Sequence, residues 1–237
     1  MGALAGQVGV VVGAGRGLGR TAATALAHEG MAVVATARTA AEVYAAVDDV
    51  TRTGGQARAV VGDASIEADA ERMIAAALDW RGRLDVLLVC AGAALIKPLL
   101  EVSLAEWEHL FAMNTRSVFL TNRAALRPML AAGAGLIINV SSRAGITGAP
   151  NIAGYTAAKA AVLGFSRALA LEVKPRGVRV ACLAPAPMDT PMRWAATPDF
   201  EPQRLISTDA VVDLVLYLAR RPDVTLEDPA VPMSVRL

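Results

Sequence analysis

Short runs of apolar residues, each bounded by glycine or by polar residues, recur along the whole chain. Uninterrupted runs of this kind are typical of strands that are buried on both faces of a parallel sheet. They predict strands at about residues 7–12, 31–36, 57–61, 84–89, 136–140, 178–183 and 231–235. The last run contains Pro232, and a proline is tolerated in an edge strand.

Stretches with helical periodicity separate these runs. They predict helices at about residues 20–29, 40–52, 67–80, 103–130, 153–173 and 208–220. Ser103 and Glu106 form a capping-box sequence at the start of the fourth helix, and 113–115 and Pro128 are candidate interruptions of it. Because strand and helix alternate with no repeat and no linker, residues 1–237 are predicted to form a single domain. The predicted fold class is α/β, a doubly wound parallel sheet of about seven strands with helices on both faces.

Composition and charge exclude several classes of protein. Hydrophobic residues make up 54% of the chain, which argues against disorder, and the net charge of +1 suggests no nucleic-acid or membrane partner. No uncharged apolar run has bilayer length, the N-terminus lacks the basic region of a signal peptide, and Cys90 and Cys182 lie in apolar runs as reduced thiols would. These features predict a cytoplasmic protein. His28 and His109 are isolated, so no metal site is expected.

A glycine-rich segment joins the first predicted strand to the first helix. It contains Gly13, Gly17 and Gly19 in the spacing G-x-x-x-G-x-G. Such glycines permit a tight turn and let backbone N–H groups at the start of the helix, including that of Leu18, approach a pyrophosphate. Turn formation alone would also explain the glycines, but their position between strand and helix favours a nucleotide site.

The residues at the end of the second strand bear on cofactor choice. A carboxylate at this place binds the ribose 2′-hydroxyl of NAD, whereas an arginine accommodates the 2′-phosphate of NADP. The strand ends in Ala35-Thr-Ala-Arg38 with no acidic residue, and Arg16 in the glycine loop is a second cation. NADP(H) is therefore the predicted cofactor, with NAD(H) as a possible substitute; the alternative for Arg38 is a solvated loop residue.

Tyr155 and Lys159 are four residues apart in the fifth predicted helix and so share one of its faces. A neighbouring ammonium group lowers the pKa of a phenol from its usual value of about 10, and the phenol can then act as a general acid or base. For the pair alone, a surface tyrosine beside a solvated lysine is the simpler interpretation.

Taken together, these motifs resemble those of the short-chain dehydrogenase/reductase family over nearly the whole chain. The ordered set consists of Gly13, Gly17, Gly19, Asp63, Ala91, Gly92, Asn114, Ser142, Tyr155 and Lys159. The segment from Val178 to Thr190, which includes Pro185, is similar to the sixth strand and cofactor-amide loop of that family.

The resemblance implies a role for each catalytic candidate. Tyr155 would protonate the carbonyl oxygen in reduction, and Ser142 would hydrogen-bond the same oxygen. Ser142 is preferred to Ser141 because of its 13-residue spacing to Tyr155. Lys159 would lower the pKa of Tyr155 and bind the nicotinamide ribose, and Asn114 would position a water in a proton relay to Lys159.

The resemblance also implies contacts with the cofactor and between subunits. Asp63 would accept a hydrogen bond from the adenine amino group, the backbone of 90–92 would flank the adenosine, and Thr190 would meet the carboxamide. Helices 103–130 and 153–173 would pair across two-fold axes to form a homodimer or homotetramer.

Several positions depart from the family pattern. Val12 stands where threonine is frequent, Val89 and Cys90 replace two asparagines, Ala186 replaces a glycine, and the chain ends without Asp-Gly-Gly. None of these departures affects Asn114, Ser142, Tyr155 or Lys159.

The leading hypothesis is an NADPH-dependent, reversible carbonyl reductase. Two alternatives remain. A 3-oxoacyl thioester reductase would need basic residues for its carrier protein; the turn at 131–135 is uncharged, although Arg176 is a candidate. A catalytically weak NADP(H)-binding scaffold or sensor would explain the departures after strand four and at Ala186. The substrate pocket is predicted to be partly apolar, formed by Met188, Met192, Trp194, Phe200, Ile146 and Ile152, although these could equally be ordinary packing residues.

Overall fold

The computed structural model describes residues 2–234, and its centre is a parallel sheet with the strand order β3-β2-β1-β4-β5-β6-β7. The strands are β1 (Val8–Val12), β2 (Ala32–Ala37), β3 (Gln56–Val61), β4 (Val86–Val89), β5 (Gly135–Val140), β6 (Val178–Pro185) and β7 (Ala230–Met233). All seven predicted strands are confirmed to within about two residues at their starts and ends. Val235, the last residue of the predicted final strand, lies outside the described residues.

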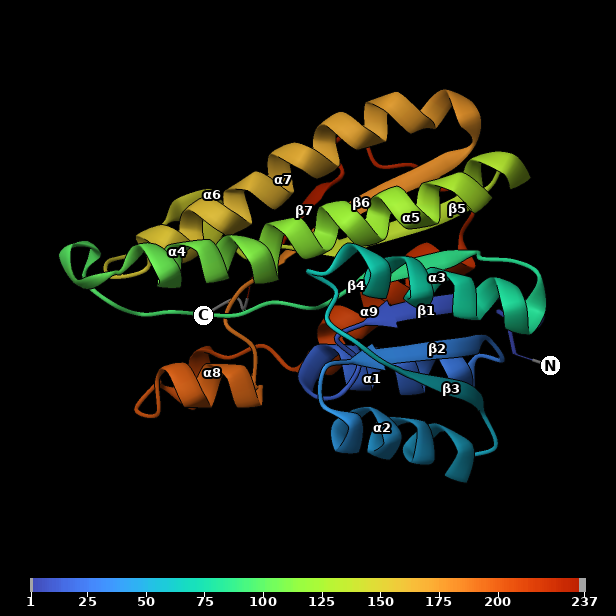
Figure 1. Ribbon diagram of the computed structural model, residues 1–237, viewed down its shortest axis with the longest axis horizontal. Helices are drawn as coiled ribbons and strands as arrows, with labels where there is room; N and C mark the ends of the chain where they lie inside the picture. The colour runs from blue at the N-terminus through green and yellow to red at the C-terminus, as the bar shows by residue number, and fades with distance from the viewer. Residues whose placement is uncertain (1, 235–237) are drawn as a thin grey trace.

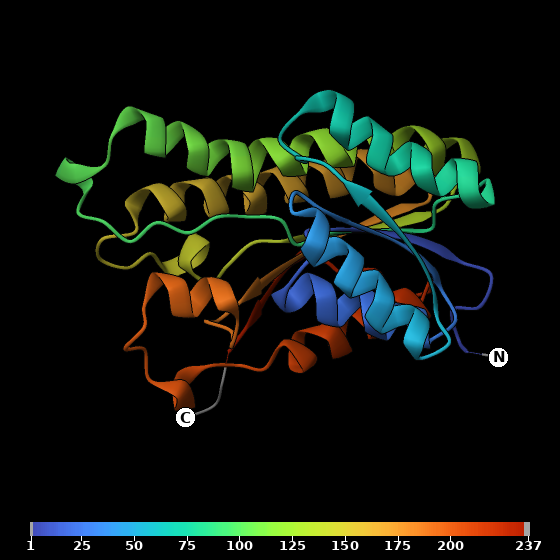
Figure 2. The same cartoon turned by 60° about the horizontal axis from the view of Figure 1, so that its bottom comes forward.

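Helices cover both faces of the sheet (Figure 1). One face packs against α1 (Gly17–His28), α2 (Ala40–Arg52) and α9 (Thr208–Arg220). The other face packs against α3 (Glu67–Arg81), α5 (Ser117–Ala132) and α7 (Ala153–Val173), and the rotated view in Figure 2 separates the two layers. The predicted doubly wound α/β fold is confirmed.

Burial on both faces explains the uninterrupted apolar runs. In β5, Leu136 and Ile138 belong to the core under α1 and α9, whereas Ile137 between them belongs to the core under α5 and α7. Successive side chains of a strand point to opposite faces, so such a strand is mainly apolar on both faces. No helix among residues 2–234 is long and apolar enough to cross a membrane.

The segment predicted as one helix at 103–130 consists of three parts. They are α4 (Leu104–Phe111), a π-helical segment (Ala112–Arg116) and α5. The predicted interruption at 113–115 is confirmed, and so is the capping box, in which Ser103 Oγ accepts from the Glu106 N–H at 3.2 Å and the Glu106 carboxylate accepts from the Ser103 N–H at 2.8 Å. The predicted break at Pro128 is wrong. Its lost hydrogen bond is tolerated because Ala125 and Met129 anchor this part of α5 in the core.

Two short helices lie outside the predicted helical ranges. The proline-rich stretch 185–202 contains α8 (Pro191–Ala196), and the segment after β5 contains α6 (Ala144–Thr147). The Thr190 hydroxyl accepts a hydrogen bond from the Arg193 N–H at 3.3 Å and caps α8. A threonine followed by a proline is a helix-start signal. Thr190 and Pro191 therefore carry in the sequence a signal for α8 that the periodicity of apolar residues does not give.

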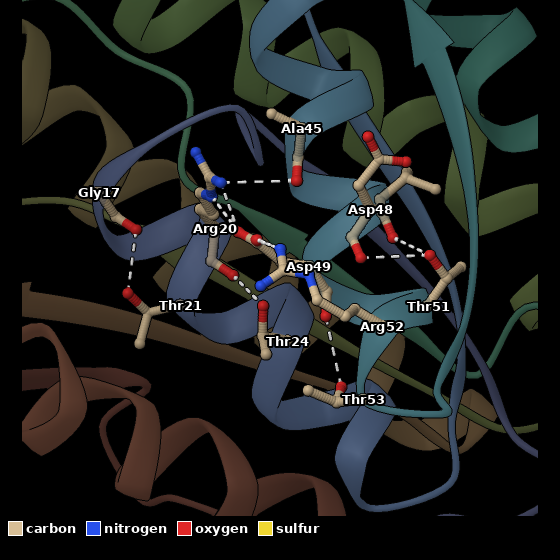
Figure 3. A network of polar contacts seen from close by, with 11 residues as sticks. Gly17, Arg20, Thr21, Thr24, Ala45, Asp48, Asp49, Thr51, Arg52 and Thr53 are labelled. Carbon is tan, nitrogen blue, oxygen red and sulfur yellow. Dashed lines mark hydrogen bonds and ion pairs between the residues drawn. The ribbon is translucent and has the colours of Figure 1, made fainter.

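A polar network holds α1 against α2 beside the glycine loop (Figure 3). Arg20 Nε of α1 donates to Asp49 Oδ2 of α2 at 2.7 Å, and Arg52 binds the same carboxylate. The hydrogen bond from Arg20, aided by Arg52, lowers the pKa of Asp49 below its usual value. Because α1 begins at Gly17, three residues before the predicted start, Gly17 and Gly19 lie in its first turn.

A buried network of two amide side chains and one hydroxyl joins α5, β5 and α7. Asn122 of α5 donates to Asn139 Oδ1 of β5 at 2.9 Å, and Asn139 donates to Asn122 Oδ1 and to Ser166 Oγ of α7, both at 3.0 Å. All three side chains are fully buried. Such a network is favourable only when each member is paired, so it fixes α5 and α7 on β5 in one arrangement.

Asn139→Ala is expected to lower the free energy of unfolding by about 3 kcal/mol, because it leaves the buried Asn122 amide without its partner. Removing both amides should cost much less than the sum of the two single changes, since the unpaired group is then gone. Urea unfolding of the wild type, Asn122→Ala, Asn139→Ala and the double variant measures this coupling. Additive losses would contradict the proposed interdependence.

Candidate active site

The residues singled out in the sequence come together at the carboxyl edge of the sheet, where two cavities adjoin. The first has a volume of about 260 Å³ and the second about 360 Å³. Because every strand is parallel, the segments after β1 to β6 all reach this edge. Tyr155 lines both cavities, as do Ser141, Met188, Thr190 and Met192. Residues 2–234 contain no cluster of three or more His, Cys, Asp or Glu side chains that could hold a metal ion.

The predicted site residues divide between the two cavities. The first is lined by Gly13, Arg16, Gly17, Leu18, Gly19, Arg38, Asp63, Ala91, Gly92, Asn114, Tyr155, Lys159 and Thr190. Ser142 and Pro185 line the second, together with Tyr155 and Thr190. Every residue of the predicted set therefore borders one cavity or the other.

The first cavity has the features of a dinucleotide site. Gly13 has a φ of +83°, and a Cβ there would lie 2.8 Å from the Ala91 nitrogen, so only glycine fits where these two loops meet. Arg16, the N-cap of α1, makes no side-chain capping bond, which leaves the first-turn N–H groups available to an anion. In the wall, the buried Thr36 hydroxyl has no hydrogen-bond partner among the described residues. A ligand with phosphate and hydroxyl groups matches this combination.

Three charged side chains line the first cavity where it meets the end of β2 and the start of α2. They are Arg16, Arg38 and Glu42. Arg16 Nη1 is 3.8 Å from Glu42 Oε1. Arg38 Nη1 contacts Met113 Sδ at 3.0 Å and has no carboxylate of residues 2–234 within salt-bridge distance. Glu42 was not noticed in the sequence; as an acidic residue in the first turn of α2 it suggested only helix stabilisation.

Lys159 is a buried cation in the wall of the first cavity. Its side chain is 5% exposed, and its Nζ donates to the Val140 carbonyl at 3.0 Å. Burial lowers the pKa of Lys159 to about 8. A Cβ at position 92 would lie 3.4 Å from this Nζ and 2.7 Å from Asn114 Oδ1, so the close packing around the ammonium group requires Gly92.

Asn114 is oriented by the π-helical segment. Its Nδ2 donates to the carbonyls of Ala93 and Leu110, both at 2.9 Å, and its Oδ1 accepts from the Ala93 N–H at 3.3 Å. Backbone bonds in a π-helix join residues five apart, and here the side-chain amide of Asn114 bonds the carbonyl four residues earlier, that of Leu110. Asn114 thereby ties the segment after β4 to the helix beside Lys159.

Tyr155 lies in the first turn of α7, and its side chain is half-buried. Burial raises the pKa of Tyr155 above its usual value, while the Ser142 hydroxyl and the positive charge of Arg193 act in the opposite direction. The expectation that Lys159 lowers this pKa is wrong for the present structure. Lys159 Nζ lies 5.9 Å from the Tyr155 ring centroid and is directed to the Val140 carbonyl, so burial dominates.

The two adjacent serines have different surroundings. Ser141 is buried, and its hydroxyl donates to the Lys159 carbonyl at 2.7 Å. Ser142 Oγ accepts from the Ala144 N–H at 3.1 Å and lines the second cavity with Tyr155. The geometry therefore leaves Ser142 as the hydroxyl available to a ligand in that cavity, which is the serine chosen from the spacing.

The second cavity is largely apolar. Met188, Met192, Ile152 and Phe200 line it as predicted. Two predicted members do not: Trp194 Nε1 donates to Asp189 Oδ1 at 2.7 Å outside the cavity, and Ile146 is 49% exposed. The sequence analysis missed Leu95, Ile96, Arg143 and Arg193. Thr190 followed by Pro191 is the sequence signal that places Arg193 in the first turn of a helix bordering the site.

Lys159→Met is expected to raise the free energy of unfolding at pH 7 by roughly 2–3 kcal/mol, because the folded chain no longer buries an ammonium group. Between pH 8 and the unfolded pKa of about 10.5, the unfolded wild type binds more protons than the folded chain, so the stability contribution of Lys159 rises with pH. The advantage of the variant should therefore shrink across this interval.

Chemical unfolding of both proteins from pH 7 to 10.5 provides the measurement. The difference between them cancels the contribution of groups that do not interact with Lys159. The thiols Cys90 and Cys182, whose pKa values burial raises and the Lys159 charge lowers, do not cancel in this way, so pH 7 to 8, where both stay protonated, is the most direct part of the comparison. Lys174→Met, at an exposed site beyond the other end of α7, is the matched control and should show no comparable gain. An equal gain in both variants would contradict the assignment to burial.

Comparisons with known proteins agree with this geometry. A family model described as short chain dehydrogenase matches residues 7–201. A 3-oxoacyl-[acyl-carrier-protein] reductase of Synechocystis sp. is 40% identical over 193 residues, covering 81% of this chain and 78% of the relative. A cyclopentanol dehydrogenase of Comamonas sp. is 38% identical over 192 residues, covering 81% and 77%.

Solved structures are similar over a longer part of the chain. The crystal structure of levodione reductase superposes with a TM-score of 0.91 at 27% identity and covers 98% of this chain and 97% of the other. A dehydrogenase/reductase from Sinorhizobium meliloti 1021 gives a TM-score of 0.85 at 31% identity, covering 98% and 94%. The chain therefore belongs to the short-chain dehydrogenase family and is an oxidoreductase that acts on hydroxyl or carbonyl groups.

Proposed function

We propose that this protein is an NADPH-dependent carbonyl reductase that also catalyses the reverse oxidation of the alcohol. The observation that carries the proposal is the position of Tyr155 in the wall shared by both cavities. Lys159 and Asn114 border the first cavity, and Ser142 borders the second. A phenol at such a junction can reach a carbonyl group in one cavity next to a nicotinamide held in the other.

The chain itself supplies the proton. When bound, the cofactor supplies a hydride to the carbonyl carbon. Tyr155 Oη donates its proton to the carbonyl oxygen, and Ser142 Oγ hydrogen-bonds the same oxygen. The hydride on carbon and the proton on oxygen together convert the carbonyl group to the alcohol. Because burial raises the pKa of Tyr155, the phenol stays protonated at neutral pH, which favours reduction. For oxidation, Tyr155 must first lose its proton, and Lys159 and Asn114 would support that transfer.

Residues around the first cavity would hold the cofactor. The N–H groups of Gly17, Leu18 and Gly19 would bind the pyrophosphate, and Asp63 would accept a hydrogen bond from the adenine. Thr190 would lie beside the carboxamide, and the Lys159 ammonium beside the nicotinamide ribose. Gly13, Ala91, Gly92 and Pro185 would shape the backbone around the same ligand.

The preference for NADP(H) over NAD(H) rests on Arg38 and Arg16. Guanidinium groups match a phosphate geometrically and electrostatically. Arg38 has no carboxylate partner in the described chain, whereas Glu42 partly neutralises Arg16. We assign the larger share of 2′-phosphate binding to Arg38 for this reason.

Reduction of 3-oxoacyl thioesters is a second candidate, supported by the 40% identical relative of that name. Arg176, the basic residue considered for carrier docking, lies beyond the far end of the 21-residue α7 from Tyr155, about 30 Å away along the helix. Docking to the same chain would therefore need other residues. Comparing turnover of a free ketone with that of an acyl-carrier thioester discriminates the two candidates.

We further propose that residues 1–237 act as one domain in a homodimer or homotetramer in the cytoplasm. Leu104 of α4 and Phe119 of α5 are large exposed apolar side chains on helices expected to pair between subunits. The two cysteines are free thiols, as in a reducing compartment. Light scattering of the purified protein measures the oligomeric state.

Tyr155→Phe is expected to lower kcat for carbonyl reduction at least ~100-fold, because the proton donor is lost while the ring remains. NADPH affinity, measured by fluorescence titration, should change little. Tyr217→Phe removes an exposed phenol on α9 and serves as the control with wild-type turnover. Full activity of Tyr155→Phe on a substrate that the wild type reduces would overturn the proposed function.

Arg38→Ala is expected to lower the ratio of kcat/KM for NADPH to that for NADH at least ~10-fold, through loss of a charged contact to the 2′-phosphate. Glu42→Gln should raise the same ratio, because it releases Arg16 from its ion pair. Arg58→Ala, on β3 and stacked on Trp80, is the matched control. An unchanged ratio in Arg38→Ala would refute the assignment of Arg38.

A further inference from the structure

The charged groups of the second cavity are both arginines. Of the described residues that line its ~360 Å³, Arg143 and Arg193 are the only charged ones, and no aspartate or glutamate is among them. The remaining wall is built from apolar side chains, glycines, prolines and hydroxyl-bearing residues. A pocket for a neutral ketone has no need of two guanidinium groups beside a largely apolar wall.

Arg193 is held toward the cavity by neutral partners. Its Nη1 donates to Thr197 Oγ1 at 3.0 Å, and its guanidinium carbon lies 4.9 Å from the Phe200 ring centroid. One of five N–H donors is thereby used, and no carboxylate of residues 2–234 lies within salt-bridge distance. Among the acids close to it in sequence, Asp189 accepts from Trp194 and Glu201 pairs with Arg204, and the exposed Asp199 forms no ion pair with Arg193.

Arg143 borders the same cavity and belongs to the segment after β5, whereas Arg193 belongs to α8. Arg143 follows Ser142 directly, and its backbone N–H donates to the Pro185 carbonyl at 3.0 Å. Its exposed side chain has no ion-pair partner among the described residues. Arg193 is also close enough to Tyr155 for its charge to act on the phenol. A ligand whose carbonyl meets Tyr155 and Ser142 therefore has positive charge within reach.

We propose that the substrate is a carbonyl compound bearing an anionic group, a carboxylate in the simplest case, which Arg193 binds with Arg143 assisting at the rim. The inference rests on the proposed function and specifies the substrate class of the same site. Guanidinium and carboxylate form paired, parallel hydrogen bonds, and the apolar surroundings strengthen the attraction. Binding of the anion at Arg193 orients the carbonyl toward Tyr155, while Ile152 and Met192 contact the hydrocarbon part between the two groups.

A compact oxo acid and the phosphate of a coenzyme A thioester share this anionic chemistry, and matched substrates distinguish them. We suggest measuring kcat/KM with NADPH for 3-oxocyclohexanecarboxylate and 4-oxopentanoate against their methyl esters. In parallel, 3-oxobutanoyl coenzyme A is compared with the phosphate-free N-acetylcysteamine thioester. The free acids are expected to exceed their esters at least ~10-fold, and the two thioesters should differ less. The opposite order would assign the arginines to a phosphate and overturn the carboxylate assignment.

Variants of Arg193 test whether this side chain causes the preference for acids over esters. Arg193→Gln should reduce the acid-to-ester ratio at least ~10-fold, and Arg193→Lys should retain part of it. The ratio cancels any effect of Arg193 on the pKa of Tyr155, because both substrates use the same phenol. Arg204→Gln is the control, since Arg204 also approaches Phe200, with 5.9 Å to the centroid, but pairs with Glu201 and does not line the cavity. A ratio near one in the wild type, or an unchanged ratio in Arg193→Gln, would overturn the proposal.

Binding can also be tested without turnover, by measuring dissociation constants of the acids and esters by calorimetry in the presence of NADP⁺. The wild type should bind each acid at least ~10-fold more tightly than its ester, and Arg193→Gln should bind both alike. Equal binding by the wild type would refute the anion site even if the enzyme reduces ketones. Absence of reduction of every carbonyl compound, with selective binding of the acids, would refute the proposed function and leave the anion site supported.

Discussion

The burial of one ammonium group constrains the whole catalytic edge of this protein. Lys159 is almost completely enclosed, donates to the Val140 carbonyl, and has its pKa lowered to about 8 by burial. A charge in this position is unfavourable unless polar groups surround it closely. The carbonyl at the end of β5, the absence of a side chain at Gly92 and the orientation of Asn114 together provide that environment. Stability is given up here in order to place a cation in the wall of the first cavity.

Regular structure positions these groups with little freedom. The buried amides of Asn122 and Asn139 with Ser166 fix α5 and α7 on β5, and α7 presents Tyr155 and Lys159 on one face. The π-helical segment before α5 turns Asn114 toward Lys159. If Tyr155 is the proton donor, as proposed, a helix fixed in this way holds its phenol in place without help from a mobile loop.

The sequence was sufficient for the sheet, most of the helices and the residues that border the first cavity. These features depend on local patterns, such as apolar runs and glycine spacing, that the chain displays directly. The pKa of Tyr155 was predicted with the wrong sign, because a spacing of four residues indicates a shared face but gives neither the direction of the Lys159 ammonium nor the depth of burial. The buried hydroxyl of Thr36 and the ion pair between Arg16 and Glu42 depend on how separate segments pack, which no local pattern reports.

Substrate recognition was the least predictable part for the same physical reason. The second cavity takes its walls from the segments after β4, β5 and β6, so its charge emerges only when Arg143 and Arg193 are brought to one space. Each arginine alone resembles an ordinary surface residue in the sequence. In the proposed mechanism the reaction and the specificity are thus encoded differently: Tyr155, the proposed proton donor, lies on the core helix α7, whereas Arg193 lies on the short helix α8, stacked on Phe200. Changes in α8 can alter the charge of the substrate cavity without disturbing the packing that holds Tyr155 and Lys159.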